Sequence, residues 1–254
     1  MQEGDRPKFL PASSVARLAP RQQSTRVLPA YKVKSCCIVA QRMSSGQQPP
    51  SLLRSVASAP GKLILFGEHA VVHDRPAVAV ATSLRTTADL EQIQELHITL
   101  SFPDLCPATF TVPLLALHPC FSLSVPSPAP CSPEFSQLLQ SIFAEHASQE
   151  HLGNAAFAAA VVPALFLLVS LVVVPGGSGC GLRLHVRSDL PVGAGLGSSA
   201  AFSVSVAAAA LELSCMAAAA SAAGPSACSR VERALVNDWA LQATHKRRCR
   251  ISSS

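Results

Sequence analysis

With 254 residues, of which 49% are hydrophobic, the chain is long enough to bury a sizeable core, and one main domain is expected. The net charge of +5 is modest and gives a nucleic-acid-binding function little support. The nine cysteines show no metal-ligand spacing, and no apolar segment with a cleavage site follows a basic start, so reduced thiols and a protein that is not secreted are expected.

Residues 1–54 are expected to form a disordered leader. They are rich in Ser, Gln, Pro and Arg and show no sustained hydrophobic period. A transit peptide is the alternative, but Glu3 and Asp5 lie where such peptides avoid acidic residues. The folded part of the chain is therefore expected to begin near residue 55.

A motif at residues 58–73, SAPGKLILFGEHAVVH, opens this folded part. Pro60-Gly61 predicts a turn, and Leu63–Phe66 predicts a short buried strand. Lys62 lies between them, and a lysine taken alone is most often a solvated surface charge. The motif gains meaning only when it is combined with a second one further along the chain.

The next hundred or so residues predict strands, then an insertion, then a helix. Short β-type runs are expected at Ala77–Thr82 and His97–Phe102. Residues 103–133 are rich in Pro and Ser, which predicts a loop or insertion. Phe135–Glu150 is expected to form a short helix.

An uncharged apolar stretch from Ala155 to Val174 is long enough to span a bilayer. A protein with a single membrane span is therefore a rival hypothesis. Pro163 interrupts the stretch, its first half is rich in alanine, and no basic cluster flanks it closely. These features favour a helix that is packed in a protein core.

The most informative segment is residues 191–200, PVGAGLGSSA. Its three glycines let the backbone turn tightly and approach a ligand closely. Leu182–Arg187 predicts a strand before the glycines, and Ala200–Leu213 predicts a helix after them. Free N–H groups and the positive end of a helix dipole would then meet at one point, which suits a phosphate. The spacing fits neither a Walker motif nor a dinucleotide motif, and a flexible Gly/Ser linker is the alternative.

The motifs at 58–73 and 191–200 together resemble those of the GHMP kinases, and within that family those of the mevalonate kinases. The resemblance covers about Val56 to Gln242. It implies an α+β fold like the second domain of ribosomal protein S5, in which a mostly antiparallel sheet lies under helices. The expected organisation is a leader at 1–54, a GHMP kinase N-terminal, ATP-binding domain at 55–242 and a non-homologous basic and Ser-rich tail at 243–254.

The resemblance implies ATP-dependent phosphorylation of mevalonate to 5-phosphomevalonate, with Mg²⁺, in isoprenoid and sterol biosynthesis. Lys62 matches the family lysine near the γ-phosphate, and Ser199 matches a hydroxyl that helps to hold magnesium, so these two are the expected catalytic residues. Glu68 and His69 match residues on the substrate side, although a core or capping role is almost as common for such a histidine. The other expected nucleotide-binding residues are Asp104, Ser188, Gly193, Ala194, Gly195, Leu196, Gly197 and Ser198. Of these, Asp104 stands where the family has an adenine-contacting Asn.

The chain departs from the family after Gln242. The family continues with Gly-Glu, whose Glu ligates magnesium, and then with a segment that carries the catalytic aspartate. Here Ala243-Thr244 follows, and Thr244 takes the place of the acidic ligand. A catalytically incomplete fragment of the kinase is therefore expected, and a non-catalytic truncated product or an interaction module is the alternative.

The resemblance also bears on location and partners. It implies a cytoplasmic protein, or a peroxisomal one, with a small-molecule substrate. The full-length family forms homodimers. No nucleic-acid or membrane partner is expected.

Overall fold

The structure is a computed structural model. It describes residues 38–39, 52–69, 73, 75–124, 128, 132–176, 179–221 and 231–248. Most of the expected leader, parts of the 103–133 segment and the last residues of the tail lie outside the described residues. The account below concerns the compact unit that spans residues 33–254.

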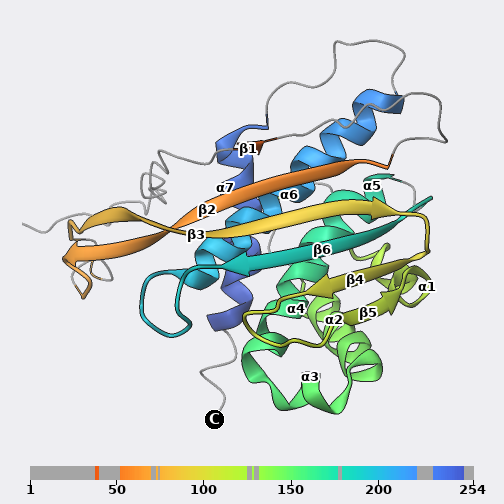
Figure 1. Ribbon diagram of the computed structural model, residues 1–254, viewed down its shortest axis with the longest axis horizontal. Coiled ribbons are helices and arrows are strands. Elements are labelled where there is room, and N and C mark those ends of the chain that lie inside the picture. Colours follow the sequence, from red (N-terminus) through yellow and green to blue (C-terminus); the bar gives the residue numbers. More distant parts are fainter. Residues whose placement is uncertain are drawn as a thin grey trace, which may run out of the picture. The chain divides into compact units, whose positions relative to one another are not determined.

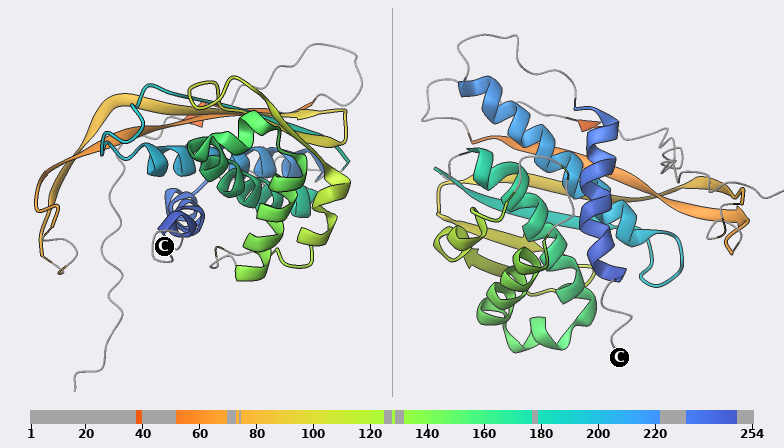
Figure 2. Two further views of the ribbon diagram at one scale, coloured as in Figure 1. Left: turned by 90° about the horizontal axis from the view of Figure 1, so that it is seen from below. Right: turned by 180° about the vertical axis from the view of Figure 1, so that it is seen from behind.

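A six-stranded sheet of order β1-β2-β3-β6-β4-β5 forms the framework (Figure 1). Its strands are β1 (Ile38–Val39), β2 (Arg54–Phe66), β3 (Val78–Ile93), β4 (His97–Ser101), β5 (Phe110–Pro113) and β6 (Gly181–Ser188). All neighbouring strands are antiparallel except β4 and β6, which run parallel. The helices lie on one face of this sheet (Figure 2). The predicted α+β fold with a mostly antiparallel sheet is thus confirmed.

The helices come after β5, some before and some after β6 in the sequence, and supply the second layer. They are α1 (Leu114–Leu117), the 3-10 turn His118–Cys120, α2 (Pro133–His146), α3 (Gln149–Gly153), α4 (Ala155–Leu168), the π-helical turn Val169–Val173, α5 (Val174–Gly176), α6 (Ser198–Ser221) and α7 (Arg233–Arg248). The helix expected at Phe135–Glu150 is therefore present as α2 and the start of α3. The helix expected from Ala200 begins slightly earlier and is longer.

Strand β6 shows why the sheet has one apolar face. Leu182, Leu184 and Val186 are buried, whereas Arg183 and Arg187 between them are exposed. This alternation is the period of two that a strand imposes, with one face on the core and the other in water. The basic strand predicted before the glycine loop is confirmed, and it delivers that loop at its C-terminal end.

The apolar stretch at 155–174 forms α4 and the turn after it, inside the core. Asn154 caps this helix by accepting the backbone N–H of Phe157 at 3.0 Å. Within the described residues, Ala155–Val173 and Ser198–Ala220 are long and apolar enough to cross a membrane, but 83% of the first window and 61% of the second are buried inside the structure. That burial favours the predicted core helix over the rival membrane span.

The turn predicted at Pro60-Gly61 is wrong, whereas the strand predicted at Leu63–Phe66 is present as the end of β2 but is not buried. Pro60 and Gly61 lie within the continuous strand β2, where the register with β3 shifts between Pro60 and Lys62 as in a β-bulge. Instead of a buried strand, Leu63, Leu65 and Phe66 are 43%, 47% and 74% exposed. They belong to a two-stranded extension of β2 and β3, here called the β2–β3 arm (residues 62–66 and 78–84), which reaches beyond the helical layer (Figure 2).

The expectation of a loop across 103–133 is also wrong in part. Phe110–Pro113 forms β5, which pairs with β4, and Leu114–Cys120 forms α1 and the 3-10 turn. The high Pro and Ser content hid a short alternating pattern in which Phe110 and Val112 are fully buried. Pro113 is compatible with this position because β5 is an edge strand. The backbone groups on its outer edge pair with no neighbouring strand, so a residue without an N–H is tolerated there.

Candidate functional site

The glycine loop between β6 and α6 has the backbone conformation that its sequence predicts. Gly193, Gly195 and Gly197 have φ angles of +80°, +72° and +76°, in the left-handed region that side chains disfavour. Residues 191–195 are exposed, so the backbone of this turn is open to a ligand. A loop of this kind offers main-chain N–H groups without a Cβ in the way.

The three glycines are required for two different reasons. A Cβ at Gly193 or Gly195 would meet nothing within 4 Å, so only the backbone conformation calls for glycine there. At Gly197, a Cβ would lie 2.7 Å from Cγ of Lys62. Glycine at this position therefore also makes room for the lysine stem.

Strand β2 holds the loop from the other side. Lys62 donates its backbone N–H to the carbonyl of Leu196 at 2.8 Å. A Cβ at Gly61 would lie 2.4 Å from Cδ2 of Leu190 and 2.9 Å from the carbonyl oxygen of Leu196. The glycine of the first motif is thus needed for close packing against the loop, and the two motifs form one local structure.

Helix α6 begins at Ser198, directly after the last glycine of the loop. Ala200 and Ala201 donate their N–H groups to the carbonyl of Gly197, at 3.0 Å each, and close the first turn. The first N–H groups of a helix have no intrahelical acceptor, and the dipole makes this end partly positive. Ser198 and Ser199 add two partly exposed hydroxyls at the same end. The arrangement suits an anion.

A short network at the end of β6 connects three further segments. The Ser188 backbone N–H donates to Oδ2 of Asp104 at 2.7 Å, and the hydroxyls of Ser188 and Thr86 lie 2.7 Å apart. Leu190 donates its N–H to the Ser188 hydroxyl at 3.3 Å. Ser188 is thereby held by β3, by the turn after β4 and by its own loop.

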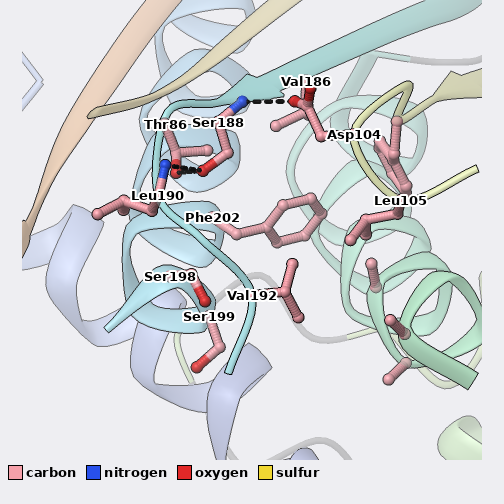
Figure 3. A pocket seen from close by; sticks show the side chains of 14 residues that line it. Thr86, Asp104, Leu105, Val186, Ser188, Leu190, Val192, Ser198, Ser199 and Phe202 are labelled. Carbon is pink, nitrogen blue, oxygen red and sulfur yellow. Dashed lines mark hydrogen bonds between the residues drawn. The ribbon is translucent and has the colours of Figure 1, made fainter. Parts of the chain in front are cut away.

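A cavity of about 260 Å³ lies between this network and the start of α6 (Figure 3). Apolar side chains make most of its wall, among them Phe102 and Phe202, whose rings meet edge to face with their centroids 5.3 Å apart. The polar lining residues are Thr86, Asp104, Ser188, Ser198 and Ser199. An apolar slot with a few polar groups at its rim is the usual form of a small-molecule site.

The structure brings most of the expected site residues together. Asp104, Ser188, Ser198 and Ser199 line the cavity, and Gly193–Gly197 and Lys62 lie beside them through the contacts above. Glu68 and His69 are exposed in the turn after β2 and do not line this cavity.

Thr86, Phe102 and Phe202 line the cavity but are not among the residues that the sequence singles out. Phe102 and Phe202 read as ordinary core residues, and Thr86 lies in the part of β3 that the sequence does not predict. A signal for Phe202 exists, because it lies one helical turn after the serines of the loop.

Comparison with known proteins agrees with this geometry in the part of the chain that holds the loop. Residues 166–236 match the family described as GHMP kinases N terminal domain. The matched segment includes β6, the glycine loop and α6. In this segment the chain is therefore similar to the GHMP kinases.

The individual relatives are mevalonate kinases. The enzyme of Dictyostelium discoideum is 36% identical over 146 residues, which cover 54% of this chain and 32% of that protein. The enzyme of Pyrococcus furiosus is 45% identical over 60 residues, which cover 24% of this chain and 18% of that protein. The matches thus span about a third or less of these relatives.

Among solved structures, the mevalonate kinase of Methanococcus jannaschii aligns with a TM-score of 0.43 at 22% identity. The alignment covers 61% of this chain and 38% of that chain.

Proposed function

We propose that this chain is the N-terminal, nucleotide-binding part of a kinase that transfers phosphate from Mg-ATP to mevalonate. The observation that carries the proposal is the junction of β6, the glycine loop and α6 beside Lys62. Phosphoryl transfer needs positioned phosphates and charge neutralisation more than covalent work by the protein, and this junction offers groups for both. The adjoining cavity is of a kind that receives a nucleobase and ribose.

Each part of the loop has a distinct role in this proposal. The backbone N–H groups of Gly193–Gly197 and the start of α6 bind the phosphates. The Ser199 hydroxyl would help to hold the magnesium ion, whose charge would neutralise the phosphates. The stem of Lys62 lies against Gly197, and the role proposed for its charge is to stabilise the negative charge of the transferring group.

In the reaction, the hydroxyl oxygen of the acceptor attacks the γ-phosphorus. The bond from that phosphorus to the bridging oxygen breaks, ADP leaves, and the hydroxyl proton is released. Glu68 and His69 are proposed to lie on the acceptor side, because their turn follows the strand that holds Lys62. The described residues contribute positioning and charge to this reaction.

A second candidate is a non-catalytic fragment or interaction module, and one observation favours it. Magnesium in such sites is usually held by one or two carboxylates in addition to phosphates. Thr244, where the family has its acidic ligand, donates its hydroxyl to the carbonyl of Ala240 at 2.6 Å. The observations therefore support nucleotide binding by this chain more strongly than they support catalytic turnover.

Other properties come from the resemblance alone. A cytoplasmic or peroxisomal location, a homodimer and a place in isoprenoid and sterol synthesis are proposed on that basis. If the apolar helix spanned a membrane instead, the protein would stay in the pellet after alkaline carbonate extraction.

The experiment that tests the nucleotide site is calorimetric titration with Mg-ATP. Gly195→Val forces a β-branched residue into the left-handed region and is expected to abolish most of the binding. Gly153→Val is the matched control, because a Cβ at Gly153 meets nothing within 4 Å and its φ is not left-handed. Equal affinity for Mg-ATP in the wild-type protein and Gly195→Val would refute the loop assignment.

A further inference from the structure

Asn154 lies at the corner between α3 and α4, and each of its four polar groups makes a hydrogen bond. Its backbone N–H donates to the carbonyl of His151 at 3.3 Å, and its carbonyl accepts the N–H of Ala158 at 3.0 Å. In its side chain, Oδ1 accepts the N–H of Phe157 at 3.0 Å, and Nδ2 donates to the carbonyl of Leu105 at 2.5 Å. Three of these bonds belong to the helices. The fourth reaches a residue 49 positions earlier in the chain.

The two partners of the side-chain amide determine its orientation. The N–H of Phe157 can only donate and the carbonyl of Leu105 can only accept, so the amide oxygen faces the helix and the NH₂ group faces Leu105. Aspartate caps a helix about as well as asparagine, but an ionised carboxylate has no hydrogen to donate. The bond to Leu105 is therefore the one contribution of Asn154 that aspartate cannot replace.

This bond joins two walls of the cavity. Leu105 belongs to the turn after β4, here called the 102–106 turn, in which Leu105 and Cys106 donate their N–H groups to the carbonyl of Phe102 at 2.9 Å each. On the α4 side the lining residues are alanines, which project little from the helix. The width of the cavity therefore depends on how far apart the turn and the helix are held. The lining residues are Phe102, Asp104 and Leu105 from the turn, and Ala156, Ala159 and Ala160 from α4 (Figure 3).

The other contacts of the 102–106 turn do not replace this bond. The thiol of Cys106 donates to Oε1 of Glu150 on α3 at 3.5 Å, but a thiol is a weak donor. The N–H of Ser188 donates to Asp104 at 2.7 Å and holds the turn against β6, on the side away from α4. The distance between the turn and α4 is thus set mainly by Asn154.

We propose that Asn154 is a positioning residue of the nucleotide site, which keeps the 102–106 turn and α4 at the separation that admits the nucleoside part of ATP. The inference rests on the proposed nucleotide-binding function. The four bonds of Asn154 go to α3, α4 and the turn, and the glycine loop keeps its shape without them. Loss of the bond to Leu105 therefore weakens binding of the nucleoside part and spares binding of the phosphates.

The test compares the affinities of Mg-ATP and of Mg-tripolyphosphate, which carries a run of three phosphates without base or ribose. In Asn154→Asp, α4 keeps its cap, but an oxygen takes the place of the NH₂ group and is repelled by the carbonyl of Leu105. Calorimetry is expected to show a fall in ATP affinity of about tenfold, the scale of one lost hydrogen bond, with little change for tripolyphosphate. A general loss of structure or an effect of charge alone would lower both affinities together.

Ser148→Asp is the matched control. Ser148 caps α3 by accepting the N–H of His151 at 3.3 Å, so this variant places the same charge at the cap of the neighbouring helix. Its side chain has no part in the bond between Asn154 and Leu105. The ratio of its ATP affinity to its tripolyphosphate affinity is expected to equal that of the wild-type protein.

A second measurement needs only the wild-type protein and decides the matter if Asn154→Asp does not fold. Hydrogen exchange is followed by NMR at the backbone amides of Leu105 and Cys106 and at the side-chain amide of Asn154. Mg-ATP is expected to slow this exchange, because the nucleoside part fills the space between the turn and α4. Mg-tripolyphosphate is expected to leave it unchanged.

A lower ratio of ATP to tripolyphosphate affinity in Asn154→Asp, with no change in Ser148→Asp, establishes the positioning role. The inference is overturned by an unchanged ratio in folded Asn154→Asp, by an equal fall in Ser148→Asp, or by amide exchange that ATP does not alter. Each of these results leaves the nucleotide site standing. If the folded wild-type protein binds neither Mg-ATP nor Mg-tripolyphosphate, the proposed function fails and the inference fails with it.

Discussion

The backbone N–H of Lys62 donates to the carbonyl of Leu196 at 2.8 Å, and this bond joins the first sequence motif to the glycine loop. The lysine stem continues along the same loop and lies against Gly197. Neither segment can be moved without the other. The lysine and the loop therefore act as one structural unit, although long stretches of chain separate them.

Gly197→Ala is expected to cost more than Gly193→Ala, although both glycines have a left-handed backbone. The conformational strain is similar in the two variants, about 1–2 kcal/mol of unfolding free energy. The new Cβ at position 197 also meets Lys62 Cγ at 2.7 Å, whereas the one at position 193 meets open space. Urea denaturation measures the two stabilities, and titration with Mg-ATP measures the accompanying loss of affinity. Equal effects of the two substitutions would show that the contact with Lys62 carries no weight.

The 254 residues tested alone are expected to turn over mevalonate several orders of magnitude more slowly than ordinary kinases. Positioning and charge stabilisation supply most of the rate in phosphoryl transfer, and Thr244, which stands in place of the family's acidic metal ligand, donates its hydroxyl to the carbonyl of Ala240. A coupled assay of ADP release with purified protein measures this rate. The prediction would be contradicted if the protein turned over mevalonate at an ordinary kinase rate and if Lys62→Met abolished that turnover.

Trp239→Ala is expected to lower the free energy of unfolding by about 3–5 kcal/mol, the usual cost of removing a large buried aromatic side chain. Trp239 is 2% exposed, and its ring lies 6.0 Å from that of Phe166, which joins α7 to α4. Leu241→Ala, on the same helix and 52% exposed, is the control and is expected to change stability by about 0.5 kcal/mol or less. Chemical denaturation compares the two, and similar losses would mean that α7 is not anchored by the tryptophan.

Cys106 is expected to make the fold less stable in alkaline solution. Burial raises the pKa of its thiol above the ordinary value of 9.0, and the nearby Glu150 carboxylate, 3.5 Å from Sγ, raises this pKa further. The native state thus keeps its proton where the unfolded chain has lost it. By linkage, this contribution is fully present below pH 9.0 and is lost as the pH rises through the native pKa.

The measurement is the free energy of unfolding at about pH 8 and about pH 10, on either side of the ordinary thiol pKa. The wild-type protein should lose more stability over this interval than Cys106→Ala. Cys180→Ala, which removes a partly exposed thiol, should behave like the wild-type protein. A Cys106→Ala variant as alkali-sensitive as the wild-type protein would argue against a protected thiol.

The parts of the fold that the sequence predicts well are those encoded locally. The alternation in Leu182–Arg187, the glycines after it and the apolar helices are each visible within a window of about ten to twenty residues. The candidate phosphate loop has the same origin, because its conformation depends on glycines that are adjacent in the chain.

The remaining features depend on pairing between distant segments. The bond between Ser188 and Asp104 exists because β4 runs parallel to β6 and brings the turn after β4 to the end of β6. From the sequence, Gly61 is predicted to be a turn residue. Its actual role, close packing against the glycine loop, depends on a segment that is distant in the chain. The strand that contains Phe110 and Val112 is too short to be predicted from its own sequence, because it is defined by its pairing with β4.

The β2–β3 arm has a practical consequence for anyone who purifies this protein. Its two strands carry Leu63, Leu65, Phe66, Val78, Val80 and Leu84, all between 39% and 74% exposed. An exposed apolar patch on a two-stranded ribbon favours association with other apolar surfaces in the sample. We therefore expect copies of the chain to associate at high concentration, which light scattering over a concentration series would measure. Affinities should be measured at low protein concentration, and a mild detergent or a Lys substitution at Phe66 should improve recovery without touching the loop.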